Sequence, residues 1–213
     1  MKVYMVSGLG ADFKALEKLQ FNENIEPVFL DWLMPEERES FNHYVERMAA
    51  RVDDSEPFYL LGYSFGGIIV QEIHKRKAAE KVVILASIKA GKERSRFMEL
   101  GRITMIPKYL PARFYNQKSA AAYAVVRRYF DPTNPKLLEY FTVREPYYLK
   151  WSVEKIVEWN GAENPEIIQI MGDKDIVFPI KNSSPDFVIK GGTHLFPVMK
   201  PKPVSKILAD IFV

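Results

Sequence analysis

Three short stretches of this sequence carry residue types that can act together as a nucleophile and its activating groups. Ser64 stands at the centre of a G-x-S-x-G pattern over residues 62–66, where its hydroxyl could attack a carbonyl carbon. Asp173 and Asp175 follow a glycine, and His194 follows a Gly-Gly-Thr turn. A histidine can accept the serine proton, and a carboxylate can orient that histidine and stabilise its cation. The set predicts nucleophilic attack on a carbonyl group.

Each of these signals is weak alone, and their order along the chain is what joins them. The motif at Ser64 could be a plain glycine–serine turn, and an aspartate in a loop is often only solvated. His43 and His74 fall within predicted helices, so His194 is the histidine left in a loop. Serine, aspartate and histidine follow one another in that order, each after a predicted strand, and this arrangement favours a catalytic set.

The chain around these loops alternates between strand and helix patterns. Short β-branched and aromatic runs predict strands at residues 2–6, 27–30, 58–61, 81–86, 166–171 and 186–189. Apolar residues at helical spacing predict helices at 11–20, 41–52, 68–77 and 202–212, the second of them capped by Ser40. The alternation predicts an α/β fold with a mostly parallel sheet of about six strands and helices on both faces. Ligands bind such sheets at the carboxyl ends of the strands, where the three stretches fall.

Residues 91–160 interrupt this alternation. The segment has no convincing strand, and prolines separate its helical runs at 119–129 and 148–159. It holds 13 of the 28 aromatic residues, which could form apolar walls for an acyl or aryl group. The plainer interpretation is that Tyr148, Trp151 and Trp159 attach the segment to the rest of the fold. Its 13 Lys and Arg against 7 Asp and Glu could guide an anionic substrate, or could form a solvated face.

These motifs resemble those of the α/β-hydrolase superfamily over essentially the whole chain. The matching stretches are the loop after the first strand, the serine motif, the aspartate loop with Pro179, and the histidine loop, at residues 7–10, 62–67, 172–175 and 192–194. In the family's G-x-x-D form the acid is the fourth residue, which is Asp175 rather than Asp173. The first loop departs from the usual His-Gly-x-Gly, because Ser7 replaces the histidine. The hydrogen-bond donor expected in this loop is a backbone N–H, which does not depend on the side chain at position 7. The replacement therefore bears mainly on the rigidity of the loop.

The resemblance implies a serine hydrolase whose catalytic residues are Ser64, Asp175 and His194. It further implies an oxyanion hole formed by the backbone N–H groups of Leu9 and Phe65. Such donors stabilise the negative oxygen of the tetrahedral intermediate, and losing one typically costs about 3 kcal/mol of transition-state stabilisation.

The resemblance also divides the chain into a core and an insertion. Residues 1–90 and 161–213 would form the hydrolase core, and residues 91–160 a helical cap inserted into it. The family often begins with an antiparallel hairpin, whereas this sequence starts directly on the strand that precedes the oxyanion loop. The departure leaves about six strands and agrees with the small size of the chain.

The expected reaction is cleavage of a small-molecule ester through an acyl-enzyme, as in a carboxylesterase. Three other chemistries use the same scaffold and stay open at this point: a thioesterase, a C–C bond hydrolase and a lyase. A ligand-binding protein with little turnover is a further alternative. The expected partner is a small acyl substrate, and neither a cofactor nor a metal is expected, because no metal-binding or nucleotide-binding motif occurs.

Length and composition exclude several other classes. The 213 residues lack cysteine, which excludes a disulfide framework, a thiolate nucleophile and Cys-based metal sites. The formal net charge of +3 and the absence of a known motif argue against a nucleic-acid-binding protein. No apolar stretch approaches the roughly 20 residues of a membrane span. The expectation is a cytoplasmic protein, and the sequence does not predict its oligomeric state.

Overall fold

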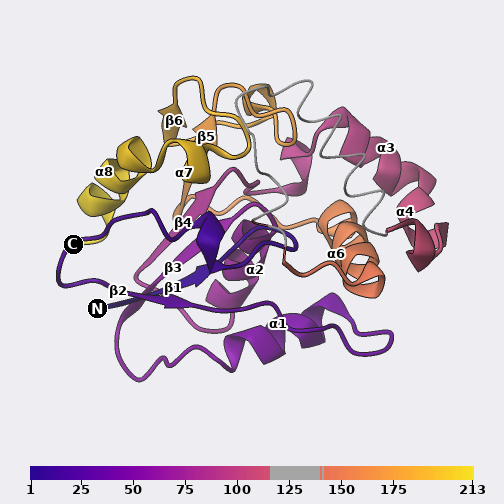
Figure 1. Ribbon diagram of the computed structural model, residues 1–213, viewed down its shortest axis with the longest axis horizontal. Coiled ribbons are helices and arrows are strands. Elements are labelled where there is room, and N and C mark those ends of the chain that lie inside the picture. The colour runs from indigo at the N-terminus through magenta and orange to yellow at the C-terminus, as the bar shows by residue number, and fades with distance from the viewer. Residues whose placement is uncertain (116–139, 141) are drawn as a thin grey trace.

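A computed structural model describes residues 1–115, 140 and 142–213 of the chain (Figure 1). Its centre is a six-stranded sheet with the strand order β2-β1-β3-β4-β5-β6. Every neighbouring pair of strands in this sheet is parallel. The strands are β1 (Lys2–Val6), β2 (Glu26–Phe29), β3 (Phe58–Tyr63), β4 (Lys81–Leu85), β5 (Ile167–Gly172) and β6 (Phe187–Ile189). The predicted strands are thus confirmed, with small differences at their ends.

The helices of the described residues lie in the connections between these strands and after the last of them. They are α1 (Phe41–Ala49), α2 (Phe65–His74), α3 (Arg96–Thr104), α4 (Ile106–Tyr109), α6 (Pro146–Glu158), α7 (Phe196–Met199) and α8 (Pro201–Ile211). Short 3-10 turns occur at Phe13–Ala15, Gly91–Glu93, Ala112–Phe114 and Ile180–Asn182. In Figure 1, α3, α4 and α6 lie together at one end of the molecule, and α8 lies at the opposite end. The predicted helical run at 119–129 falls outside the described residues.

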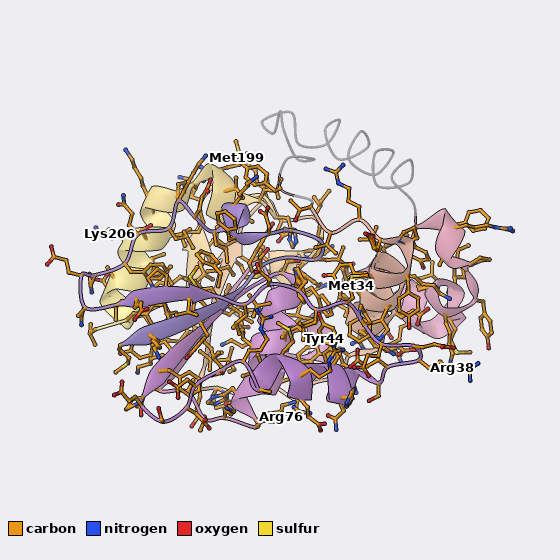
Figure 2. All side chains as sticks on the ribbon, turned by 60° about the horizontal axis from the view of Figure 1, so that its bottom comes forward. Met34, Arg38, Tyr44, Arg76, Met199 and Lys206 are labelled. Atoms are coloured by element: carbon orange, nitrogen blue, oxygen red, sulfur yellow. The ribbon has the colours of Figure 1, made fainter. Side chains whose placement is uncertain are left out.

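The sheet is buried on both faces, which is why its strands are apolar almost throughout. All six residues of β3 are buried, and successive residues point to opposite faces. Leu60 belongs to the core on the side of α1 and α2, whereas Leu61 belongs to the core on the side of α8. Figure 2 shows Tyr44 of α1 in the middle of the molecule and Lys206 of α8 at its outline. Helices therefore cover both faces, as predicted.

One predicted helix is wrong. The spacing of apolar residues predicted a helix over 11–20, but the structure has only the 3-10 turn Phe13–Ala15 there. The Asp12 side chain accepts a hydrogen bond from the Lys14 N–H, the local bond by which aspartate favours turns over helix interiors. Leu16 and Leu19 are nevertheless buried, so the pattern identified core residues while misjudging the backbone that presents them.

Two other helices differ from prediction only at their ends. α1 begins after Ser40, whose hydroxyl accepts a hydrogen bond from the His43 N–H, so the predicted cap is confirmed. α2 begins at Phe65 rather than at residue 68, and it includes Gly66 and Gly67. Glycine disfavours helix interiors, but the close packing of this helix start on its neighbours overrides that preference.

The strand order has a topological switch point between β1 and β3. The chain passes from β1 to β2 on one side and then to β3 on the other side. The direction of strand succession therefore reverses between β1 and β3, and the loops at their carboxyl ends diverge. Ser64 follows β3, and the loop of Leu9 follows β1, so both lie at this point of the sheet.

The connection from β4 to β5 contains α3, α4 and α6. Tyr148, Trp151 and Trp159 are almost fully buried, and Trp151 lies 4.5 Å from the Tyr44 ring of α1, centroid to centroid. The plainer interpretation of these three aromatics, as attachment to the rest of the fold, agrees with this burial. Among the described residues, no helix combines the length and apolar composition that crossing a bilayer requires.

Candidate active site

Ser64 occupies a sharp turn between β3 and α2. Its backbone has φ 54° and ψ −117°, a conformation that residues with a side chain rarely adopt. The two flanking glycines permit the turn, because a Cβ on Gly62 would collide with the Gly66 backbone and one on Gly66 with the carbonyl oxygen of Val6. The G-x-S-x-G spacing is thus a packing requirement, and it presents the serine at the end of the sheet.

The neighbouring strand β4 holds this turn from its other side. The Ser64 N–H donates to the carbonyl of Leu85 at 2.9 Å, and the Ser87 hydroxyl donates to the carbonyl of Ser64 at 2.7 Å. Ala86, which lies between Leu85 and Ser87, has a positive φ of 46°. Ser87 was not predicted, because a serine after a strand carries no distinguishing signal.

Three predicted residues meet at this position. The His194 Nε2 lies 2.9 Å from the Ser64 Oγ, and the His194 Nδ1 lies 2.8 Å from the Asp175 Oδ2. The three side chains come from the loops after β3, β5 and β6, up to 130 residues apart in the chain. This is the geometry in which an imidazole can accept a serine proton while a carboxylate fixes its tautomer.

The structure distinguishes the two candidate aspartates. The Asp175 side chain has no exposed surface, and its Oδ1 accepts hydrogen bonds from the N–H groups of Val177 at 2.8 Å and Phe178 at 3.1 Å. These two bonds leave the Oδ2 turned toward His194. Asp173 is exposed, and the imidazole Nδ1 bonds Asp175 instead. The arrangement agrees with the choice of Asp175 that the family motif implied.

Two aromatic residues that the sequence analysis did not single out position the histidine loop. The Tyr63 hydroxyl donates to the backbone carbonyl of His194 at 3.0 Å, and the two rings lie 5.6 Å apart. The Phe178 ring also lies 5.6 Å from the imidazole. Tyr63 directly precedes Ser64, so its place within the motif is the signal that could have identified it. Phe178 offered no such signal.

The predicted oxyanion donors come from the loops after two neighbouring strands, Leu9 after β1 and Phe65 after β3. Phe65 is the first residue of α2, and the first N–H groups of a helix have no acceptor within the helix. The N–H of Leu9 has no acceptor among the residues that the structure describes. Two uncommitted N–H groups beside a nucleophile are what an oxyanion hole requires.

The replacement of the family's histidine by Ser7 does not leave the first loop unsupported. The Ser7 hydroxyl donates to the carbonyl of Ala11 at 2.8 Å, and the N–H of Gly10 donates to the hydroxyl of Tyr148 on α6 at 3.3 Å. The Gly10 carbonyl accepts from the N–H groups of Thr142 and Val143 at 2.9 and 3.0 Å. Burial raises the pKa of Tyr148 well above its ordinary value, so its hydroxyl stays neutral. The chain before and within α6 thus braces the loop.

One cluster outside this site has ligand types suited to a metal. Single ligand atoms of Glu36, Glu39 and His43 lie within 4.8 Å of one another. Arg47 already donates to both carboxylate oxygens of Glu39 at 3.0 Å, and His43 contacts the same carboxylate at 2.8 Å. These bonds account for the cluster without an ion. Glu36 and Glu39 lie in the loop before α1, and His43 lies in the first turn of that helix.

No protein-family model matches the chain, and no curated protein sequence matches it. Solved structures do. A thermophilic esterase from Thermogutta terrifontis is similar with a TM-score of 0.65 at 14% identity, over 99% of this chain and 89% of that one. A lipase-esterase related protein from Clostridium acetobutylicum gives 0.68 at 16% identity, over 100% and 94% of the two chains. A type II thioesterase of the yersiniabactin pathway gives 0.61 at 14% identity, over 99% and 90%.

These similarities cover the whole chain and nearly the whole of each neighbour. The protein therefore has the α/β-hydrolase fold that its motifs predicted. At identities this low the comparison establishes the fold, and the reaction has to be argued from the site.

Proposed function

We propose that this protein is a serine hydrolase that cleaves small-molecule esters through an acyl-enzyme. The observation that carries the proposal is the continuous chain of hydrogen bonds from Ser64 through His194 to the buried Asp175, at 2.9 and 2.8 Å. Distances within hydrogen-bond reach allow proton transfer without rearrangement of the protein. The esterase neighbours of the same fold support an ester as the first substrate class to test.

In the first half of the reaction, the Ser64 Oγ attacks the carbonyl carbon of the ester. The Nε2 of His194 accepts the serine proton, and Asp175 stabilises the imidazolium that forms. The carbonyl oxygen becomes an oxyanion, which would accept hydrogen bonds from the N–H groups of Leu9 and Phe65. The imidazolium then donates its proton to the leaving alcohol, and the C–O bond breaks to leave an acyl-enzyme.

In the second half, water replaces the alcohol. The neutral His194 accepts a proton from water, which attacks the acyl carbon. A second tetrahedral intermediate forms against the same two N–H groups and collapses, and the proton returns to the Ser64 Oγ. The acid product leaves, and the free enzyme is regenerated. Every group that this cycle needs lies on the carboxyl-end loops of the sheet.

Residues 91–160 act as the cap over this site in our proposal, between the core segments 1–90 and 161–213. The N–H of Gly91 donates to the carbonyl of Gly161 at 3.3 Å, so the segment leaves and rejoins the core at one place. This supports an insertion that could vary without disturbing the sheet. Its positive formal charge would favour anionic acyl substrates over cationic ones. A cytoplasmic location rests on composition alone and stays a prediction.

The same residues could serve a thioester, and the similarity to a type II thioesterase makes this the second candidate. Attack, oxyanion and acyl-enzyme are unchanged, and only the leaving group differs. A C–C hydrolase and a lyase need substrate contacts that no observation here favours. A panel of p-nitrophenyl esters and matched thioesters would rank the two main candidates by kcat/KM.

The deciding experiment is covalent labelling with a fluorophosphonate, which reacts with an activated serine. We expect wild-type protein to be labelled at Ser64 and the Ser64→Ala variant to remain unlabelled. Ser205→Ala is the matched control, because Ser205 is buried beside Gln20 and far from the site in the fold. Absence of labelling in folded wild-type protein would overturn the proposal in favour of a ligand-binding protein with little turnover.

A further inference from the structure

Trp32 links the first loop to the strand on its other side. It lies just beyond the carboxyl end of β2, the strand that pairs with β1. Its indole N–H points into the loop after β1, where it donates to the carbonyl of Gly8 at 3.0 Å and to that of Ala11 at 3.1 Å. A single donor thus spans the turn that contains Leu9.

The bond to Gly8 acts on the proposed oxyanion donor through one peptide group. The Gly8 C=O and the Leu9 N–H belong to the same peptide, which is planar and trans, so the two bonds point in opposite directions. The Ala11 N–H also donates to this carbonyl, at 2.9 Å. Fixing the carbonyl therefore fixes the direction of the Leu9 N–H, and hydrogen bonds to the carbonyl polarise the peptide toward a stronger donor.

The face of the same indole contacts the second proposed donor. The Trp32 and Phe65 rings are stacked, with centroids 5.2 Å apart and planes 10° from parallel. Phe65 is fully buried, and its backbone carries the other uncommitted N–H. Trp32 therefore contacts the Gly8–Leu9 peptide through its N–H and the Phe65 side chain through its ring, from a third strand end of the sheet. The order β2-β1-β3 brings these three loops side by side.

We propose that Trp32 is a positioning residue that sets the distance and direction between the Leu9 and Phe65 N–H groups. This inference rests on the proposed serine hydrolase function. Trp32 orients the Leu9 peptide by its N–H and the start of α2 by its ring, while making no bond to the reacting atoms. A group of this kind affects the transition state, where the oxyanion exists, more than the bound substrate.

The test is Trp32→Phe, which keeps an aromatic ring for the stack and removes the indole N–H. Losing a whole oxyanion donor costs about 100-fold or more in kcat. Because Trp32→Phe only loosens a donor, we expect a smaller fall of about tenfold, with KM within about twofold. Inhibition by a boronic acid, whose tetrahedral adduct with Ser64 mimics the intermediate, should weaken by a similar factor. Rates are normalised to serine that reacts with the fluorophosphonate, so that misfolded protein does not count.

Trp159→Phe is the matched control. Its indole N–H also donates inside the fold, to the Glu72 Oε1 at 2.8 Å, and Trp159 is buried more deeply than Trp32. Within the described part of the chain it makes no hydrogen bond to the first loop and no ring stack on Phe65. We expect its kcat to equal that of wild type even where its Tm falls. The inference is overturned if Trp32→Phe loses no more kcat than Trp159→Phe, or if its loss lies in KM alone. Failure of the proposed function is a separate result, in which the wild type itself neither turns over esters nor is labelled.

Discussion

The loops around Ser64 and the helices α3 and α4 are built in opposite ways. Around Ser64, the aspartate, the histidine loop and the start of α2 are buried, and their polar groups are bonded to one another or to backbone. In α3 and α4 no residue is buried, and large apolar side chains are exposed: Phe97 at 85%, Leu100 at 57%, Ile103 at 65%, Ile106 at 58% and Tyr109 at 72%.

This difference indicates which region can change without loss of the reaction. In the first region each side chain is fixed by several neighbours, so a substitution displaces a reacting group. In α3 and α4 the side chains have few neighbours among the described residues. A substitution there therefore leaves the packing of the core unchanged. The proposed chemistry would then be insensitive to α3 and α4, whereas the choice of substrate would not be. Paired substitutions in the two regions test this contrast.

The largest effect is expected from removing the nucleophile or its base. Ser64→Ala and His194→Ala should each lower kcat for p-nitrophenyl acetate by about 10⁴- to 10⁶-fold, because they act as one unit. Phe97→Ser in α3 should keep kcat for this small ester within about threefold. Circular dichroism confirms that the variants are folded. Residual wild-type rates in Ser64→Ala would show that another residue carries the reaction.

The second prediction compares the two aspartates of one loop. Asp175→Asn preserves shape but presents an amide to His194, which can then hold the wrong tautomer, and kcat should fall by about 10⁴-fold. Asp173→Asn changes an exposed side chain and should leave kcat within about twofold. Steady-state kinetics on both variants measures the two values of kcat. The reverse ranking would transfer the role to Asp173.

The third prediction compares two phenylalanines by stability. Phe196 is fully buried in the core beside α8, and Phe196→Ala should lower the free energy of unfolding by about 3–5 kcal/mol. Phe97→Ala removes an exposed ring and should change it by less than about 0.5 kcal/mol. Urea unfolding followed by fluorescence measures both. A comparable loss in Phe97→Ala would mean that α3 is covered in solution.

The fourth prediction compares two glycines within helices. A Cβ on Gly66 would collide with the backbone of Val6, so Gly66→Ala should cost about 1–3 kcal/mol and displace Ser64 as well. The nearest atom of the described residues to a Cβ on Gly101 of α3 would be 3.7 Å away, and Gly101→Ala should gain about 0.5–1 kcal/mol from helix propensity. Thermal unfolding should therefore shift in opposite directions. A stabilised, fully active Gly66→Ala would refute the packing argument for the serine turn.

The smallest effects concern two ion pairs. Burial alone would raise the pKa of Glu39, but the Glu36 N–H, Arg47 and His43 outweigh it and lower that pKa. Hydrogen bonds from Arg102 and Arg94 lower the pKa of Glu99 in α3 to about 2. A lowered carboxyl pKa contributes stability above the unfolded pKa and loses it as the pH falls through the folded pKa.

Glu39→Gln should therefore lower Tm at pH 7, and the difference from wild type should shrink as the solution is made acidic. Glu99→Gln should lower Tm by less, and added salt should remove the difference from wild type. The Glu99–Arg102 ion pair is partly exposed, so solvent and salt screen it. Calorimetry across pH and salt concentration measures both variants. A pH-independent difference for Glu39→Gln would indicate that its charge contributes nothing.

The sequence predicted the sheet better than the segments between its strands. Strand runs such as residues 81–86 are recognisable because burial on both faces demands continuous apolar residues. The helix predicted over 11–20 failed because a local bond of Asp12 and tertiary packing decided the backbone there. Within the site, Ser64, Asp175 and His194 were predicted from motifs and their order, and the structure brings these three side chains together. Ser87, Phe178 and Trp32 could not be, because their roles depend on which backbone carbonyl or ring lies opposite.

The sequence by itself determined the fold class and the reacting groups that we propose. Periodicity records burial, and a strained turn needs glycines at set places, so both leave a mark on the order of residues. Only the tertiary structure decided which carboxylate faces the histidine and what replaces the missing histidine of the first loop. It also placed the Trp32 indole against the Gly8 carbonyl and the Phe65 ring. These are contacts between residues far apart in the chain, and no local pattern encodes which of them will meet.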